Sequence, residues 1–163
     1  MKCIDDLLAA NANTENCRVL KNKGSIVFSS EHDLPVDLQY YLSNYESVEL
    51  FKTADYPITI VGVNNFKKAN PIILIDDAEN DISDNWFVVA TDNRLQYITI
   101  DLAKERLGRC YNSFWDRHGI IGEQPIIANS FTELLQALYE NKGGYPYWLR
   151  EDFQKLGDAY DGL

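Results

Sequence analysis

The chain has few of the residues that build metal sites and covalent cross-links. Its 163 residues include two histidines, His32 and His118, and three cysteines, Cys3, Cys17 and Cys110. None of them has the C-x-x-C or H-x-x-x-H spacing of a zinc site, and three cysteines cannot all pair with one another. We therefore expect no metal, no cofactor and reduced thiols, as in a cytoplasmic protein.

Long apolar runs and catalytic motifs are missing as well. No run approaches the about 18 apolar residues of a membrane helix. The N-terminus turns acidic at Asp5 and Asp6, before the apolar region that a signal peptide needs. The phosphate-binding patterns G-x-x-x-x-G-K and G-x-G-x-x-G do not occur, and neither does the G-x-S-x-G nucleophile elbow. His118 near Asp116 could be drawn as a dyad, but an Asp-Arg-His-Gly turn is typical of solvated surface. We expect a protein that is not an enzyme.

Bases are scarce relative to acids. Twenty-five Asp and Glu against 15 Lys and Arg give a formal net charge of −10. Such a surface repels nucleic acid and anionic membranes and favours cationic partners, although many proteins are acidic for solubility alone. The acids concentrate in one segment without a base, at Asp76, Asp77, Glu79, Asp81 and Asp84. Two interpretations remain open for this segment: a solvated loop, or a docking surface for a basic protein.

The strongest strand pattern lies in the middle of the chain. Residues 86–91 are aromatic and β-branched, residues 96–100 alternate in polarity, and Asp92-Asn93-Arg94 between them suits a turn. This pattern predicts two central antiparallel strands. Weaker patterns predict further strands at 25–29, 48–52, 58–63, 72–75, 109–115 and 125–128.

Helical spacing of apolar residues predicts helices near both ends of the chain. The clearest helix begins at residue 131, where Ser130 and Glu133 form a capping box, and ends before Gly143. A second helix is expected at 35–45, a short one at 2–10, a helical connection at 103–107, and an amphipathic helix over 149–160. Strands massed between helices predict an α+β fold, a mostly antiparallel sheet with N-terminal and C-terminal helices, in a single domain over residues 1–163.

An aromatic stretch, Tyr145, Tyr147 and Trp148, follows the capped helix. Aromatic side chains of this kind are the desolvated anchors of many protein interfaces. The alternative is that they pack the C-terminal segment onto the sheet. Both interpretations stay open from the sequence.

Three segments in this order resemble the SUKH superfamily, which includes fungal cell-wall assembly regulators and many bacterial immunity proteins. They are LPVDLQYYL at 34–42, the strand pair VVATD at 88–92 with YITID at 97–101, and IANSFTELL at 127–135. The resemblance is strongest over 34–139. The chain departs from the superfamily pattern after the first helix, where Asn-Tyr-Glu-Ser stands at 44–47, so we expect a divergent member.

The resemblance implies stoichiometric protein binding: an immunity protein that neutralises a cognate toxin, often a nuclease, inside the producing cell. Nucleases tend to be basic because they hold phosphates, so an acidic chain suits that role. The expected partner is a basic protein, with no nucleic acid and no membrane. The alternatives are a regulatory scaffold of the same superfamily, or an enzyme or small-ligand module with a cleft beside the central strands.

Overall fold

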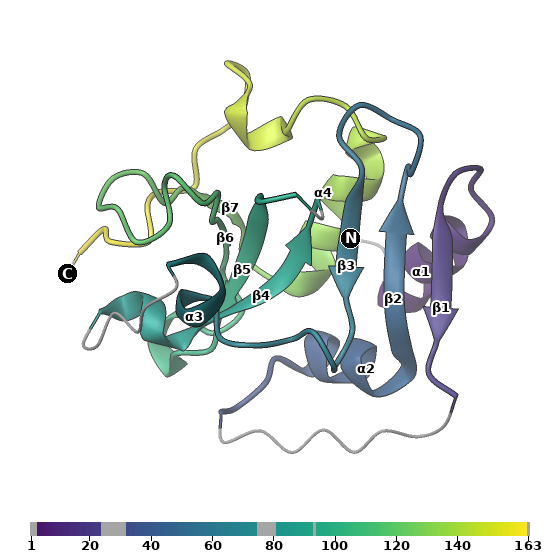
Figure 1. Cartoon of the computed structure of the whole chain (residues 1–163), viewed down its shortest axis with the longest axis horizontal. Helices are drawn as coiled ribbons and strands as arrows, with labels where there is room; N and C mark the ends of the chain where they lie inside the picture. The colour runs from purple at the N-terminus through teal and green to yellow at the C-terminus, as the bar shows by residue number, and fades with distance from the viewer. Residues whose placement is uncertain (1–2, 24–31, 75–80, 93, 163) are drawn as a thin grey trace.

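Seven strands form one antiparallel sheet in the computed structural model of the chain, which describes residues 3–23, 32–74, 81–92 and 94–162. The strands pair in sequence order, so each lies beside the next along the chain (Figure 1). Their bounds are β1 Arg18–Lys21, β2 Tyr45–Leu50, β3 Ile58–Val61, β4 Trp86–Thr91, β5 Tyr97–Asp101, β6 Cys110–Asn112 and β7 Ile126–Ala128. The predicted α+β class with an antiparallel sheet is confirmed.

The central pair forms where the sequence predicts it. Strands β4 and β5 pair with Trp86 opposite Asp101 and Thr91 opposite Tyr97. Asp92 stabilises the connection, because its carboxylate accepts hydrogen bonds from the backbone N–H groups of Arg94 at 2.8 Å and Gln96 at 3.1 Å. Asp favours turns because its short side chain can accept hydrogen bonds from backbone N–H groups a few residues further along the chain.

The helices are α1 Ile4–Ala12, α2 Val36–Asn44, α3 Asn70–Ile73 and α4 Phe131–Asn141, with short 3-10 turns at Ile82–Asn85, Lys104–Arg106 and Tyr147–Leu149. Helices α1 and α4 lie behind the strands in Figure 1, whereas α3 lies in front of them. The fully buried side chains Leu38, Leu134 and Leu135 join strand residues such as Ile60 in one core. None of the helices in the described part of the chain is long and apolar enough to cross a membrane.

The start of α4 confirms the cap at Ser130, although the return bond of the capping box goes to the residue before it. Ser130 accepts a hydrogen bond from the backbone N–H of Glu133 at 3.1 Å, and Glu133 accepts one from the backbone N–H of Asn129 at 2.9 Å. Asp37 on α2 adds a bond that the sequence did not reveal, because its carboxylate accepts from the backbone N–H of Thr132 at 2.8 Å. One carboxylate thereby ties the start of α2 to the positive end of the α4 dipole.

Two sequence predictions are wrong. The strand expected at 72–75 is the end of helix α3 as far as the structure describes it, since Pro71 at the first helical turn favours helix. The helix expected at 149–160 is absent from described residues 150–162, which turn and run beside β7. There Ile126 N–H bonds to the Gly157 carbonyl, and Gly157 has a φ of +114°, which interrupts a helix.

Other boundaries shift by a few residues. The helix expected at 2–10 spans Ile4–Ala12, and the strand expected at 109–115 is only Cys110–Asn112. The strand expected at 25–29 lies outside the described residues. Strand β1 was not predicted, because it is a short edge strand whose Val19 and Leu20 are only half-buried.

Candidate functional site

The acidic segment is described only at its C-terminal end. Asp76, Asp77 and Glu79 lie outside the described residues, whereas Asp81 caps the 3-10 turn Ile82–Asn85 and Asp84 lies within it. Asp81 accepts hydrogen bonds from Ser83 N–H at 3.1 Å and from the Tyr160 hydroxyl at 2.8 Å. Burial alone would raise the pKa of Asp81, but these hydrogen bonds outweigh it and lower that pKa. Asp84 accepts from the Asn70 amide at 3.3 Å, so both acids have bonds within the fold.

The aromatic stretch divides between packing and exposure. The Tyr147 hydroxyl donates to the Ile127 carbonyl at 2.8 Å, and the Tyr147 ring stands edge-on to both Trp148 and Phe153. Trp148 is buried, with 6% of its surface exposed, whereas Tyr145 is 50% exposed. Tyr147 therefore holds the C-terminal segment onto the sheet, and Tyr145 is the member of the stretch that a partner can reach.

Tyr145 lies in an apolar groove of about 570 Å³. Exposed apolar side chains from four separate segments line this groove, which we call the aromatic groove: Tyr56 (44% exposed), Leu95 (57%), Trp115 (57%) and Tyr145. Trp148, Phe114 and Ile58 are also part of its lining. The rings of Tyr56 and Tyr145 are perpendicular, with centroids 5.6 Å apart, and form an aromatic corner.

Polar groups of two kinds belong to the same groove. Asp55, Asp92 and Arg94 are its charged lining residues. The indole N–H of Trp148 and the side-chain carbonyl oxygen of Gln96 are shielded from solvent, and neither has a hydrogen-bond partner among the described residues. A buried polar atom without a partner is uncommon in a folded protein and calls for an explanation.

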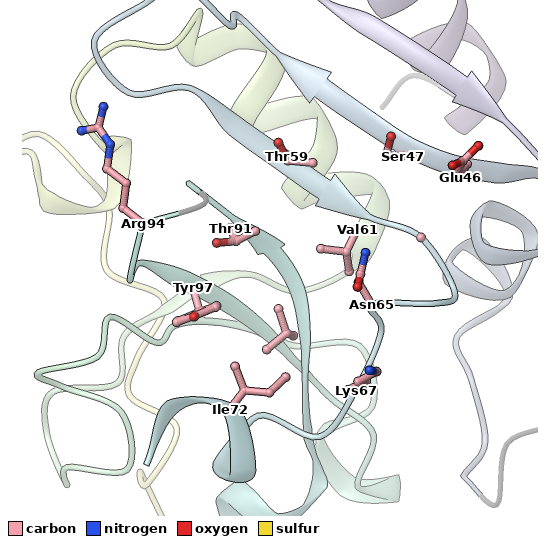
Figure 2. A pocket seen from close by; sticks show the side chains of 12 residues that line it. Glu46, Ser47, Thr59, Val61, Asn65, Lys67, Ile72, Thr91, Arg94 and Tyr97 are labelled. Carbon is pink, nitrogen blue, oxygen red and sulfur yellow. The ribbon is translucent and has the colours of Figure 1, made fainter. Parts of the chain in front are cut away.

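A second hollow, of about 430 Å³, lies on the sheet and shares Arg94 with the aromatic groove. Figure 2 shows its lining from β2, β3, β4 and β5, with Ser47, Thr59, Thr91 and Tyr97 across the strands and Ile72 of α3 at one side. The described lining contains one carboxylate, Glu46, and no histidine or cysteine.

A sequence profile of the SMI1/KNR4 family (SUKH-1) matches residues 29–137. The chain belongs to this family. It is also 48% identical over 160 residues to a Bacillus subtilis (strain 168) protein named "Immunity protein YokJ", an alignment that covers 98% of this chain and 97% of that protein. No solved structure matches the chain. The superfamily resemblance seen in the three segments is confirmed.

In this SUKH-1 chain His118 is buried, which contradicts its prediction as solvated surface. Only 3% of the residue is exposed, its Nε2 lies 2.7 Å from the Asn70 side-chain oxygen, and its ring stands edge-on to Trp86. Burial is the main cause that lowers its pKa from about 6.5 to about 4, although the charge of Asp81 acts in the opposite direction. The nearby Asp116 is exposed, so the two side chains lie in opposite environments.

Sequence reasoning missed a buried acid, Asp101 at the end of β5. Its carboxylate, which is fully buried, accepts from Trp86 Nε1 at 3.0 Å, the Tyr111 hydroxyl at 3.1 Å, Arg106 Nε at 2.8 Å and Ala103 N–H at 2.8 Å. We call Asp101, Trp86, Tyr111 and Arg106 the Asp101 cluster. With four donors, the carboxylate is satisfied within the fold and serves structure.

The described residues offer no group of three or more His, Cys, Asp or Glu side chains that is arranged to hold a metal ion. The three cysteines are free thiols, exposed at Cys3, half-buried at Cys17 and buried at Cys110. Burial raises the pKa of Cys110 well above its ordinary value, which keeps that thiol protonated and unreactive.

Proposed function

We propose that this chain is an immunity protein that neutralises a cognate toxin by direct, stoichiometric binding and without catalysis. The observation that carries the proposal is the near-full-length similarity to a protein named as an immunity protein, within the SMI1/KNR4 family. The aromatic groove supports it, because clustered exposed aromatic side chains mark protein-binding surfaces. A regulatory scaffold and an enzyme remain the alternatives that the experiments below separate from it.

The chemistry of the chain favours a basic, nuclease-type toxin. Such toxins hold phosphates with Lys and Arg, and a protein with a formal net charge of −10 attracts them over long range. In this proposal the acids Asp76, Asp77 and Glu79 steer the toxin, and Asp81 and Asp84 extend the same negative surface. Tyr145 supplies direct contact, while Tyr147 and Trp148 support it from beneath.

Growth protection is the direct test. If a large secreted protein is encoded immediately upstream, its C-terminal domain would be expressed in a bacterial host, alone and together with this chain. We expect the domain to stop growth alone and growth to resume with the chain, while a toxin domain from another system is not neutralised. Growth arrest that the chain does not relieve would contradict the immunity function.

Association kinetics test the steering role of the acids. Converting Asp76, Asp77 and Glu79 together to Asn and Gln should slow association with the toxin, because charges at the rim of an interface act mainly on encounter. The effect should shrink at high salt, since screening acts over about 8–10 Å near physiological ionic strength. The control removes the same charge at exposed Glu15, Glu151 and Asp152. Equal on-rates for both triple variants would remove the acidic segment from the interface.

A further inference from the structure

We infer that the aromatic groove binds a basic side chain, an arginine or a lysine, from a polypeptide segment of the toxin. This inference rests on the proposed function and specifies which surface makes the contact and what it recognises. The occupant follows from three properties of the groove: its exposed rings, its charges and its unpaired polar atoms.

The exposed aromatic residues of the chain concentrate at this groove. Four aromatic side chains in the described part of the chain are exposed, and three of them, Tyr56, Trp115 and Tyr145, line it. They come from segments that are far apart in sequence, so local composition does not explain the cluster. Tyrosine and tryptophan are the residues that most often anchor interfaces, which distinguishes this groove from the polar hollow on the sheet.

The geometry of the rings suits a cation. Tyr56 and Tyr145 contact each other edge to face with centroids 5.6 Å apart, and both residues stay about half exposed, so ring surface that the pair does not cover faces solvent. The face of an aromatic ring attracts Arg and Lys, and desolvation strengthens the attraction. A guanidinium group is planar and weakly hydrated, so it stacks on such rings more readily than an ammonium group does.

The lining charges favour the same occupant. Asp55 and Asp92 contribute two carboxylates against the single guanidinium of Arg94. Figure 2 shows the Arg94 side chain directed away from Thr91 and Tyr97. Two acids beside exposed rings, in a chain of formal net charge −10, complement a basic residue on a basic toxin.

Several buried side chains in the described part of the chain have unpaired polar atoms, and two of these side chains line the aromatic groove. Trp148 offers an indole N–H donor and Gln96 a carbonyl acceptor, both without partners among the described residues. Both atoms are shielded from solvent, so the two side chains must rotate before a peptide carbonyl can accept from the indole N–H, or a guanidinium or peptide N–H can donate to the Gln96 oxygen. An incoming segment that supplies both would remove the cost of leaving them unpaired.

The test compares groove variants with matched controls in binding to the toxin domain that passes the growth test. Tyr56→Ala with Tyr145→Ala should weaken the complex about 100-fold, as expected for interface anchors, and Asp55→Asn should weaken it about tenfold. The controls are Ile121→Ala, an apolar residue that is 77% exposed outside the groove, and Asp6→Asn on α1. Both controls should bind as the wild type does. Groove variants that bind as tightly as the controls would overturn the inference and leave the immunity function intact.

Two further measurements decide whether the occupant is basic. Each Lys and Arg of the toxin domain would be changed to Met, and one of them should show non-additive coupling to Asp55→Asn in a double-mutant cycle. Coupling to none of them would overturn the inference.

Without any toxin, N-acetylarginine amide should shift the Trp115 indole N–H resonance more than its uncharged isostere N-acetylcitrulline amide does, and Asp55→Asn should remove the difference. Equal shifts by the two compounds would also overturn it, whatever the outcome of the growth test.

Discussion

Trp86 and Trp148 are both buried, but the indole N–H of Trp86 is hydrogen-bonded and that of Trp148 is not. Trp86 donates to Asp101 at 3.0 Å inside a cluster in which the carboxylate accepts four hydrogen bonds. Trp148 lies beneath the aromatic groove, and its indole N–H has no partner among the described residues. The third tryptophan, Trp115, is exposed in the same groove.

The difference separates a structural region from a binding region. In the Asp101 cluster the fold supplies the partners for the buried acid, so nothing is left for another molecule to recognise. In the aromatic groove the fold leaves exposed rings and unpaired polar atoms that cost stability until a partner covers them. Changes in the first region should therefore affect folding, and changes in the second should affect binding.

The largest loss of stability is expected for Asp101→Ala. It removes the partner of Arg106 and leaves the Trp86 N–H and Tyr111 hydroxyl buried without an acceptor. Breaking a buried ion pair on one side costs about 3–5 kcal/mol. Urea unfolding would measure it, with Asp55→Ala in the groove as the control. Equal losses for the two variants would abolish the distinction between the regions.

A loss of similar or smaller size is expected for Leu135→Ala in α4. The side chain is fully buried in the core, and truncation of a core leucine costs about 2–5 kcal/mol. The variant should unfold earlier in thermal denaturation but bind toxin normally at low temperature, because it lies outside the groove. Weaker binding by the folded variant would show that the core and the groove are coupled.

Acid should destabilise the protein through His118. Its pKa is about 4 in the folded state against about 6.5 when unfolded, so the unfolded chain binds the extra proton between these values. The contribution of neutral His118 to the free energy of unfolding is therefore fully present above about pH 6.5. It is lost as the pH drops toward about 4, by at most about 3 kcal/mol. Unfolding of wild type and His118→Gln across this range isolates the contribution of His118 from that of the carboxylates. Parallel pH profiles would contradict it.

The smallest effect on stability is expected in the groove itself. Trp115→Ala removes a side chain that is 57% exposed, so the free energy of unfolding should change by less than about 0.5 kcal/mol. Binding to the toxin should nevertheless weaken. A clear drop in melting temperature would show that Trp115 belongs to the structural region.

Local patterns predicted the elements whose causes are local. The Ser130 cap, the Asp92 turn and the α2 stripe each depend on residues a few positions apart, and each is confirmed. The prediction of a C-terminal helix was wrong because the apolar spacing at Leu149 and Phe153 also fits a segment of successive turns that packs against the sheet. The positive φ of Gly157 and its backbone hydrogen bond to Ile126 of β7 prevent a helix in this segment, and apolar spacing reveals neither of them.

The sites were less predictable because they assemble from distant segments. Asp101 meets Trp86 across a strand pair and Arg106 across a turn, and the sequence marks none of them as partners. Buried His118 has its hydrogen-bond partner in Asn70, 48 residues away. Of the groove, the sequence indicated Tyr145 and Trp148, but Tyr56, Leu95 and Trp115 join them only in the folded chain.

The most direct measurement is the two-dimensional ¹H–¹⁵N NMR spectrum of the three tryptophan indoles before and after addition of the toxin domain. The groove account predicts that the Trp115 and Trp148 resonances shift when the complex forms, with Trp148 moving as its N–H gains an acceptor. The Trp86 resonance, already bonded to Asp101, should stay in place. A complex that forms while the Trp115 and Trp148 resonances remain unchanged would contradict the account and place the toxin on another surface.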